Sequence, residues 1–453
     1  MRVLHAIHDF LPRHRAGSEI YALHLCRELA GRHDVTVLCA DYDPHQPHGH
    51  VTWRLYEGLP VVEITNNWRC GRFVETYRPP VIAERLDHVL RAIQPDVVHV
   101  HNLLNLSFDL PLLARRRGAS VVATLHDYTL LCASGGQRVH VAEQHVCHEI
   151  DTQRCARCFR QSPFGAQVAL GRLAGKTAIA PAFDAAATLA RRFPRTIGRL
   201  ANRVGRIPAL SVSARDVDDR LAAGRAVFEH VDAVVAPSAS IASEFARFGM
   251  PIAKMRTMDY GFVPIARRRT SASSSRLRIG YVGTLVWHKG VHALIDAVRA
   301  LPLTAYALKV FGDVAVFPEY VADLRTRARG LPVQFEGKFD QRDVSDVYRQ
   351  FDVLVVPSLW LENSPLVIHE AFMAGVPVVA ARIGGIADLI EHGRTGLLYD
   401  PNQAGALEAA LRSLMETPRR LEDLTVGVQT RTRVRSMTED ADAWDVIYRD
   451  VRK

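Results

Sequence analysis

Two glutamates, Glu362 and Glu370, flank seven residues in a segment that predicts a strand, a loop, a helix and a second strand. The apolar run 352–356 predicts the first strand, and Pro365 suits the first turn of the helix, where its missing N–H is not needed. This order places Glu362 in the loop before the helix and Glu370 one to two turns inside it. Carboxylates on both sides of a helix start can accept hydrogen bonds from sugar hydroxyls.

The start of this predicted helix also provides backbone N–H groups that have no partner inside the helix. Ser364, Leu366 and Val367 are expected to supply them. These donors and the helix dipole favour a phosphate group. A phosphate flanked by carboxylates that favour sugar hydroxyls indicates a site for a nucleotide sugar.

The segment resembles the Glu-x7-Glu signature of retaining glycosyltransferases of family 4, which have the GT-B fold of two facing Rossmann-like domains. Pro357-Ser358 before it and 374–379, Ala-Gly-Val-Pro-Val-Val, after it match as well. The spacing alone would be weak, because two glutamates eight positions apart occur on many solvated helices. The resemblance implies that Glu370 holds the ribose hydroxyls. It assigns the donor sugar to Glu362 and the residues after it, Asn363, Ser364, Pro365 and Leu366.

A glycine-bearing turn, 283–290, follows the strand predicted to begin at Leu277. Gly283 lets the backbone approach a diphosphate, and Lys289 supplies a mobile cation. The turn resembles the family's Gly-Arg-Leu-x-x-x-Lys-Gly turn, in which Arg and Lys hold the leaving diphosphate. Because Thr284 stands where the Arg is common, the resemblance implies that Lys289 carries more of this task. The alternative for Lys289 is a solvated lysine at a helix start.

A loop near the N-terminus, 16–19, reads Ala-Gly-Ser-Glu and opens a predicted helix. It resembles the family's Gly-Gly-x-Glu loop, which lies against the donor phosphates. Ala16 replaces the first glycine, so only Gly17 is assigned to donor binding. A simple glycine at a helix start is the alternative.

Histidines end two predicted strands of the N-terminal half. His126 matches the family histidine that contacts the donor sugar and stabilises positive charge at the anomeric carbon; a structural histidine is the alternative. His101 and Asn102 resemble acceptor-side contacts of the family. Asp41-Tyr42-Asp43 matches a metal-binding motif of another glycosyltransferase fold, and we interpret it as a polar loop.

Four of the seven cysteines fall close together, at Cys132, Cys147, Cys155 and Cys158. A Cys-x2-Cys pair preceded by two more cysteines can close a tetrahedral thiolate shell around zinc. Disulfides are not expected in a reducing compartment. Free or redox-active thiols are the alternative, because the first two cysteines are irregularly spaced.

These residues must be positioned by two regions in which apolar strands alternate with helices, the pattern of parallel sheets covered on both faces. Strands are predicted near 3–7, 35–39, 97–100, 121–125, 232–236, 277–283, 307–311, 333–335, 353–356 and 376–380, and helices near 18–30 and 80–93. We expect an α/β protein of GT-B type. Its parts are an N-terminal domain (1–265) with a Cys-rich and basic insertion (about 130–230), a linker (266–276), a nucleotide-sugar domain (277–435) and a helix (436–453) that in the family crosses back.

The chain has 453 residues, a formal charge of +9 and 48% hydrophobic residues, which suits an ordinary globular protein. No apolar run approaches the ~18 residues that span a bilayer, and the start, 1–9, suits a buried strand better than a signal peptide. We therefore expect a cytoplasmic protein. Basic and apolar residues interleave between Arg172 and Arg206, which suits a basic amphipathic helix on the inner face of the plasma membrane. A solvated helical face is the alternative, and no motif points to nucleic acid.

Together these features predict a retaining glycosyltransferase that moves a hexosyl unit from a nucleotide diphospho-sugar to a glycan or lipid-linked acceptor in polysaccharide biosynthesis. The resemblance implies that no cofactor is required for catalysis; zinc would be structural. Two alternatives are a GT-B sugar-nucleotide epimerase, which would carry acidic residues for proton transfer in the first domain, and a non-catalytic nucleotide-sugar binder. Thr284 is the one hint of a degenerate site.

Overall fold

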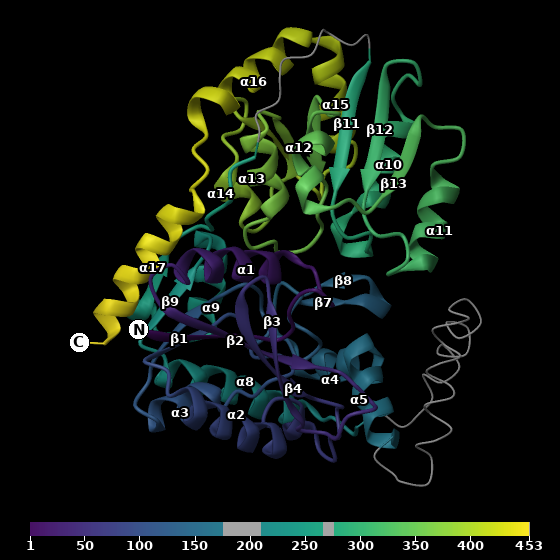
Figure 1. The fold of residues 1–453 in the computed structure, drawn as a ribbon. Coiled ribbons are helices and arrows are strands. Elements are labelled where there is room, and N and C mark those ends of the chain that lie inside the picture. The colour runs from purple at the N-terminus through teal and green to yellow at the C-terminus, as the bar shows by residue number, and fades with distance from the viewer. Residues whose placement is uncertain (175–209, 266–275, 453) are drawn as a thin grey trace. The chain divides into compact units, whose positions relative to one another are not determined.

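The computed structural model describes residues 1–174, 210–265 and 276–452, so the predicted linker lies outside the described residues except for Arg276. The chain divides into two compact units (Figure 1). Unit 1 comprises Met1–Pro237, Ala242–Met258 and Asp440–Lys453, and unit 2 comprises Ser238–Ile241 and Asp259–Glu439.

Unit 1 is built on a sheet of eight strands in the described part of the chain, in the order β10-β9-β6-β5-β1-β2-β4-β3. All neighbouring strands are parallel except β3 and β4, which are antiparallel. The strands are β1 (Arg2–Ile7), β2 (Asp34–Asp41), β3 (Val51–Tyr56), β4 (Leu59–Thr65), β5 (Val97–Val100), β6 (Ser120–Thr124), β9 (Ala233–Ala236) and β10 (Met255–Thr257). Every residue of β5 and β9 is buried, as expected for strands covered on both faces.

Helix α2 (Pro80–Ile93) shows how a helix of unit 1 buries one apolar stripe. Its buried residues Ile82, Leu86, Val89 and Leu90 follow helical spacing. Other helices of the unit are α1 (Gly17–Leu29), α3 (Leu110–Arg116), α4 (Thr152–Gln161), α5 (Pro163–Ala174), α8 (Ala214–Val227) and α9 (Ala239–Arg247), and a two-stranded hairpin pairs β7 (Val139–His140) with β8 (His145–Val146).

The C-terminal helix α17 (Met437–Val451) belongs to unit 1 from Asp440 onward. Asp440 accepts a hydrogen bond of 2.7 Å from the Tyr21 hydroxyl of α1, and the Trp444 indole donates to the same hydroxyl at 3.1 Å. Trp444 and Tyr448 are fully buried. Trp444 and Tyr448 are therefore part of the core of unit 1.

Unit 2 holds a six-stranded parallel sheet in the order β13-β12-β11-β14-β15-β16. Numbered within the unit this is 3-2-1-4-5-6, the doubly wound order of dinucleotide-binding folds. The strands are β11 (Leu277–Val282), β12 (Tyr306–Phe311), β13 (Val333–Gly337), β14 (Val353–Val356), β15 (Val378–Ala381) and β16 (Gly396–Tyr399). The helices are α10 (Val291–Arg299), α11 (Pro318–Arg327), α12 (Val344–Tyr348), α13 (Leu366–Met373), α14 (Ile386–Leu389), α15 (Ala406–Glu416) and α16 (Pro418–Arg431).

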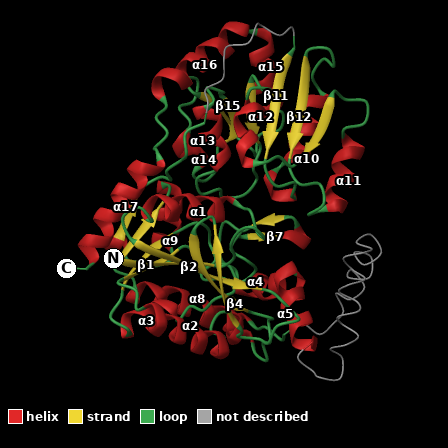
Figure 2. Cartoon of the chain, viewed as in Figure 1, coloured by secondary structure: helices red, strands yellow, loops and turns green. Residues whose placement is uncertain are grey.

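Two hydrophobic clusters fill unit 2. One cluster contains side chains of α10, α11 and α15, and the other contains side chains of α12 and α13. Each set of helices, drawn in red in Figure 2, thus packs against the sheet through its own core. The predicted α/β fold is confirmed in both units. Among the described residues no helix is long and apolar enough to cross a bilayer.

Candidate functional site

The loop between β14 and α13 carries most of the predicted donor residues. Helix α13 begins at Leu366 with Pro365 as its N-cap, and no side chain caps it. The N–H of Ile368 donates to the Pro365 carbonyl at 3.0 Å, whereas the N–H groups of Ser364, Leu366 and Val367 donate to no backbone carbonyl within the described chain. The helix start therefore keeps backbone donors available to an anion.

Glu362 and Lys289 form an ion pair inside unit 2. The ammonium of Lys289 donates to Oε1 of Glu362 at 2.6 Å, and the Ser358 hydroxyl donates to the same oxygen at 2.5 Å. Burial of this carboxyl opposes its ionisation, but the charge of Lys289 and the two hydrogen bonds hold the pKa of Glu362 below its ordinary value. Glu362 is only 4% exposed, so this is an ionised carboxylate in a nearly closed setting.

Two glycines allow the backbone to close around this pair. Gly290 has φ +74°, and a Cβ there would lie 1.9 Å from the Pro357 carbonyl oxygen. Gly385 donates its N–H to the Glu362 carbonyl at 2.7 Å, and a Cβ there would lie 1.5 Å from the Asn363 carbonyl oxygen. The Lys289 turn and the segment after β15 thus meet the Glu362 loop at backbone contact. The sequence analysis missed Gly385, although the pair Gly384-Gly385 after a buried strand was a visible signal.

Glu370 lies on the first turns of α13 and is 9% exposed. Its Oε2 accepts a hydrogen bond of 2.8 Å from the Tyr348 hydroxyl. Burial raises the pKa of Tyr348 well above its ordinary value, and the neighbouring Glu370 adds to the shift. Tyr348 therefore remains a protonated donor that orients the Glu370 carboxyl.

The side chains of Asn363 and Ser364 are engaged within unit 2. The Ser238 hydroxyl lies 3.1 Å from Oδ1 of Asn363, and the Ser364 hydroxyl donates to Asp259 at 2.7 Å. Ser364 also shares a hydrogen bond of 2.9 Å with Nε2 of His369. These side chains fix the loop, which leaves ligand contact at these positions to the backbone.

The turn after β11 begins at Gly283, whose N–H donates to the Phe311 carbonyl at 3.1 Å. Thr284 is exposed, and its carbonyl accepts from the Tyr281 hydroxyl at 2.9 Å. No cation replaces the missing Arg at this position itself. Lys289 alone brings positive charge from the turn to Glu362.

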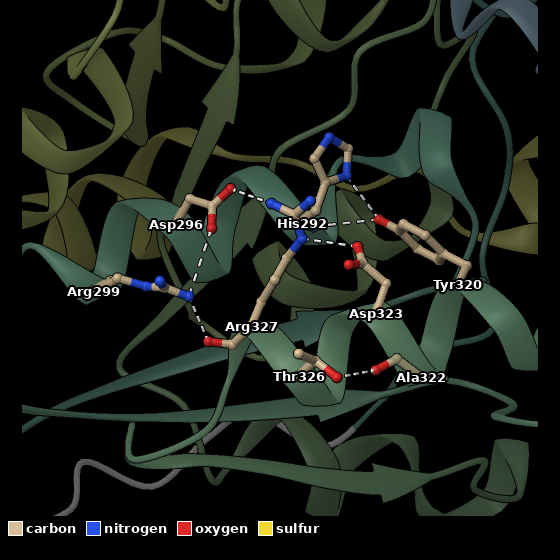
Figure 3. A network of polar contacts seen from close by, with 8 residues as sticks. All are labelled: His292, Asp296, Arg299, Tyr320, Ala322, Asp323, Thr326 and Arg327. Carbon is tan, nitrogen blue, oxygen red and sulfur yellow. Dashed lines mark hydrogen bonds and ion pairs between the residues drawn. The ribbon is translucent and has the colours of Figure 1, made fainter.

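The helix that follows this turn, α10, is tied to α11 by a polar network (Figure 3). His292 lies two residues after Gly290, and its Nδ1 shares a hydrogen bond of 2.8 Å with the Tyr320 hydroxyl. Arg327 of α11 donates to Asp296 at 2.8 Å and to Asp323 at 2.8 Å. Helix α10 starts directly after the turn that carries Lys289. These bonds therefore fix the helix that follows Lys289.

In unit 1 the predicted Gly17 is the first residue of α1. The helix start is organised by Glu19, which accepts from the Ala16 N–H at 3.0 Å and lies 3.2 Å from Nε2 of His8 and 3.6 Å from Nδ1 of His14. Burial opposes ionisation of Glu19, but the neighbouring rings of His14 and His8 bring its pKa down to about 2. The sequence analysis missed this cluster; the signal was a glutamate in the first turn of the helix predicted near 18–30.

His126 and His101 are brought together at the ends of β6 and β5. Nε2 of His126 shares a hydrogen bond of 2.9 Å with Nδ1 of His101, whose Nε2 shares one of 3.0 Å with Nδ1 of His5. Burial lowers the pKa of His126 to about 3, although part of its side chain reaches the surface. At neutral pH the ring is therefore uncharged.

Asn102 lies beside this histidine pair. Its side-chain amide donates to Asp127 at 2.8 Å, and Asp127 also accepts from the Thr129 N–H at 2.8 Å. His101, Asn102, His126 and Asp127 line one cavity of about 30 Å³ in unit 1. The predicted acceptor-side residues and His126 thus form one polar cluster.

Two further predictions concern other regions. Cys132, Cys147, Cys155 and Cys158 are free thiols that line one small cavity in unit 1. The basic stretch lies outside the described residues except for Arg172, so the structure does not bear on it.

Two family models match this chain, one in each unit. The model of the family "Glycosyl transferases group 1" matches residues 263–429, and that of "Glycosyltransferase Family 4" matches residues 15–160. Glycogen synthase of Mycobacterium tuberculosis is 31% identical over 198 residues, which are 41% of this chain and 46% of the relative. D-rhamnosyltransferase WbpZ of Pseudomonas aeruginosa is 31% identical over 34% of this chain and 40% of its own. The chain thus matches less than half the length of these curated relatives.

Solved structures show the same fold over nearly the whole chain. Sucrose-phosphate synthase from Thermosynechococcus elongatus has a TM-score of 0.66 at 18% identity and covers 99% of this chain and 98% of its own. Anabaena HepE in complex with UDP-glucose has a TM-score of 0.60 at 16% identity and covers 99% and 100%. With one family model on each unit and two doubly wound sheets, the chain belongs to the family 4 glycosyltransferases of GT-B fold.

Proposed function

We propose that the protein is a retaining glycosyltransferase that uses a UDP- or GDP-sugar as donor. The observation that carries this proposal is the Lys289–Glu362 pair at 2.6 Å, next to the uncapped start of α13. The cation and the backbone donors match the diphosphate of a nucleotide sugar, and the two carboxylates match its hydroxyls. The HepE structures, which hold UDP and UDP-glucose, support a nucleotide-sugar ligand on this fold.

In the proposed reaction the bond between the anomeric carbon and the diphosphate oxygen breaks first. The oxygen that leaves with the diphosphate then takes the proton of the acceptor hydroxyl, and the acceptor oxygen bonds to the anomeric carbon on the same face. Lys289 stabilises the negative charge that grows on the diphosphate. His126, uncharged at neutral pH, is proposed to stabilise the positive charge on the sugar ring without adding a positive charge of its own.

The donor contacts are divided between the two ends of the α13 segment. Glu370, oriented by Tyr348, is proposed to accept hydrogen bonds from the ribose hydroxyls. Glu362 and the N–H groups of Ser364, Leu366 and Val367 are proposed to hold the transferred sugar and its phosphate. Gly283 of unit 2 and Gly17 of unit 1 are each proposed to let the backbone approach the donor phosphates.

We further infer that the acceptor is a glycan or a saccharide on a lipid carrier in polysaccharide assembly. The support is the charge of the sequence, since basic residues between Arg172 and Arg206 alternate with apolar ones. Attraction to an anionic leaflet of about 1 kcal/mol per basic residue would bring the enzyme to lipid-linked acceptors reversibly. Changing Arg191, Arg192, Arg195 and Arg199 to Gln should reduce sedimentation with anionic liposomes and leave donor hydrolysis unchanged. Equal liposome binding by parent and variant would assign the stretch to a solvated surface.

The donor is tested by thermal shift with UDP-, GDP-, ADP- and dTDP-sugars, followed by hydrolysis of the donor that stabilises the protein. We expect one nucleotide class to raise Tm and to be hydrolysed slowly without acceptor. The K289M variant should lose hydrolysis, whereas K309M, which removes a lysine of the same unit paired with Glu336, should keep it. Stabilisation without any hydrolysis by the parent would instead favour a non-catalytic binder.

A further inference from the structure

We propose that Cys132, Cys147, Cys155 and Cys158 together bind one zinc ion in unit 1. The four cysteines come from three separate segments: the loop after β6, the residue directly after β8, and α4. All four line the same cavity of about 20 Å³. A space of this size holds one small occupant, and four thiolates are the ligand set of a closed structural zinc site.

The backbone around the cavity is organised before any metal enters. The Cys147 N–H donates to the Arg138 carbonyl at 2.8 Å, and the Cys132 N–H donates to the Tyr128 carbonyl at 2.8 Å. Asp151 caps α4 by accepting from the Arg154 N–H at 3.0 Å, so Cys155 and Cys158 lie one turn apart on a fixed helix. Each of the three segments thus holds its cysteine at the cavity by its own hydrogen bonds.

Charge near the cavity complements a zinc tetrathiolate, which carries two negative charges. Arg138 and Arg154 line the same cavity as the cysteines. The Nε of each is buried and has no hydrogen-bond acceptor among the described residues. Both guanidiniums nevertheless have partners: Arg138 binds Glu244 and the His148 carbonyl, and Arg154 lies 3.7 Å from Glu143 and bonds His145 at 2.8 Å. Guanidinium N–H groups can donate to thiolate sulfur, so bound zinc would give both buried donors an acceptor. Glu244 and Glu143, which pair with these arginines, and Glu149, which lines the cavity, offset part of their positive charge.

Metal binding requires the thiols to turn inward. Zinc–sulfur bonds of about 2.3 Å place the sulfurs of a tetrahedral site about 3.8 Å apart. Among the described residues, two groups of three possible metal ligands have all their ligand atoms within 4.8 Å of one another: His5/His99/His101 and His8/His14/Glu19. The four cysteines are not such a group, so their sulfurs lie farther apart than this. Rotation about the Cα–Cβ bonds, with the backbone kept, is the movement that zinc would drive.

The buried group His5/His99/His101 is a weaker metal candidate than the cysteines. His99 shares hydrogen bonds with Tyr448 at 2.7 Å and with Thr124 at 2.8 Å, and His101 bonds His5 and His126. These bonds occupy both ring nitrogens of His99 and of His101, whereas Nε2 of His5 has no hydrogen-bond partner among the described residues. The cysteine sulfurs make at most weak contacts, such as the one of 3.9 Å from Cys158 to the Val139 carbonyl.

The consequence of this site is a brace for the polar cluster of unit 1. Cys132 lies five residues after Asp127, and the intervening loop is closed by the Tyr128 N–H, which donates to the Gly136 carbonyl at 3.0 Å. The Asp127 carboxylate in turn accepts a hydrogen bond from the Asn102 side-chain amide. Zinc would therefore join α4 to the loop that positions Asp127, and its loss would loosen this loop without removing any residue that contacts substrate.

The test is metal analysis of the full, tag-free chain, which does not depend on transfer activity. We expect about one zinc per chain and, after exchange with cobalt(II), thiolate-to-cobalt charge-transfer absorption. Each of C132S, C147S, C155S and C158S should abolish stoichiometric zinc, while C70A, which changes a buried cysteine outside the cavity, should retain it.

Two results would overturn the proposal. One is parent protein without stoichiometric zinc after growth and purification in zinc-containing medium. The other is thiol titration of the unfolded, unreduced chain that finds fewer than its seven cysteines free, which would assign the cluster to a disulfide. If the serine variants do not fold, the cobalt spectrum of the parent decides, because coordination by four sulfurs differs from coordination by nitrogen and oxygen.

Discussion

The ammonium of Lys289 and the carboxylate of Glu362 lie 2.6 Å apart, although 73 positions separate them in the chain. The family resemblance assigned one to the diphosphate and the other to the sugar, yet without a ligand they neutralise each other. An incoming diphosphate offers Lys289 a second anion, while Glu362 keeps the Ser358 hydroxyl as a donor. We therefore expect an incoming diphosphate to share Lys289 with Glu362, because the buried carboxylate would otherwise keep only a neutral hydroxyl as partner.

Replacing Lys289 by Met should lower turnover by about 10²–10³, the effect of losing one group that stabilises charge in the transition state. Thr284 offers no second cation in the turn, so no neighbour compensates. Steady-state kinetics with the donor found by thermal shift measure the effect. K309M is the matched control, and turnover of K289M close to that of the parent would mean that another group holds the diphosphate.

Replacing Glu370 by Ala should weaken donor binding by roughly 1.5–3 kcal/mol, because the ribose hydroxyls lose a charged acceptor. Calorimetric titration with the nucleoside diphosphate alone isolates this contact from the sugar. E408A, which changes a glutamate of α15 that is paired with Arg412, is the control and should keep parental affinity. An unchanged dissociation constant for E370A would remove Glu370 from the donor site.

Replacing Gly385 by Ala should disturb the site through the backbone. The new Cβ would lie 1.5 Å from the Asn363 carbonyl oxygen and 2.8 Å from the Ser238 hydroxyl, so the Glu362 loop must move. Overpacking of this kind costs about 1–3 kcal/mol, and a moved loop should also lose donor affinity. G31A is the control, since its Cβ would meet only the Glu28 carbonyl at 3.6 Å. Parental Tm and affinity in G385A would show that the loop adapts freely.

Local patterns predicted the elements of the site well, because each depends on a few neighbouring residues. The structure places β14 at Val353–Val356, as predicted, and α13 begins directly after Pro365. The hairpin of β3 and β4 was missed. Its edge strand β3 is largely exposed, with Trp53 and Leu55 on the surface, so it lacks the buried apolar run that marked the other strands.

Contacts between distant segments could not be predicted. The Lys289–Glu362 pair, the Tyr348–Glu370 bond and the bond from Ser364 to Asp259 each depend on how strands and helices pack. The same holds for the histidine chain from His126 to His5, because three strands supply one member each. Sequence spacing identifies the residue types but not which of them become partners.

The last prediction concerns how stability depends on pH through two members of this histidine chain, His5 and His101, and their neighbour His99. His5, His99 and His101 are at most 3% exposed, and burial lowers the pKa of each, that of His5 to about 3. In the unfolded chain their pKa lies near 6.5. Below that pH the unfolded state takes up protons that the folded state does not, so the free energy of unfolding falls as pH falls. The expected slope is up to about 1.4 kcal/mol per pH unit for each histidine, and above about pH 7 these residues contribute no slope.

Urea unfolding of the full chain from about pH 7.5 to about pH 5 measures this slope. H5N removes one member of the chain and should make the slope shallower by up to one proton, even if it lowers the overall stability. H50Q changes an exposed histidine of the same unit and should keep the parental slope. A free energy of unfolding that stays constant across this range would show that the buried rings accept protons in the folded state. In that case the uncharged His126 on which the proposed transition-state role depends would have to be abandoned.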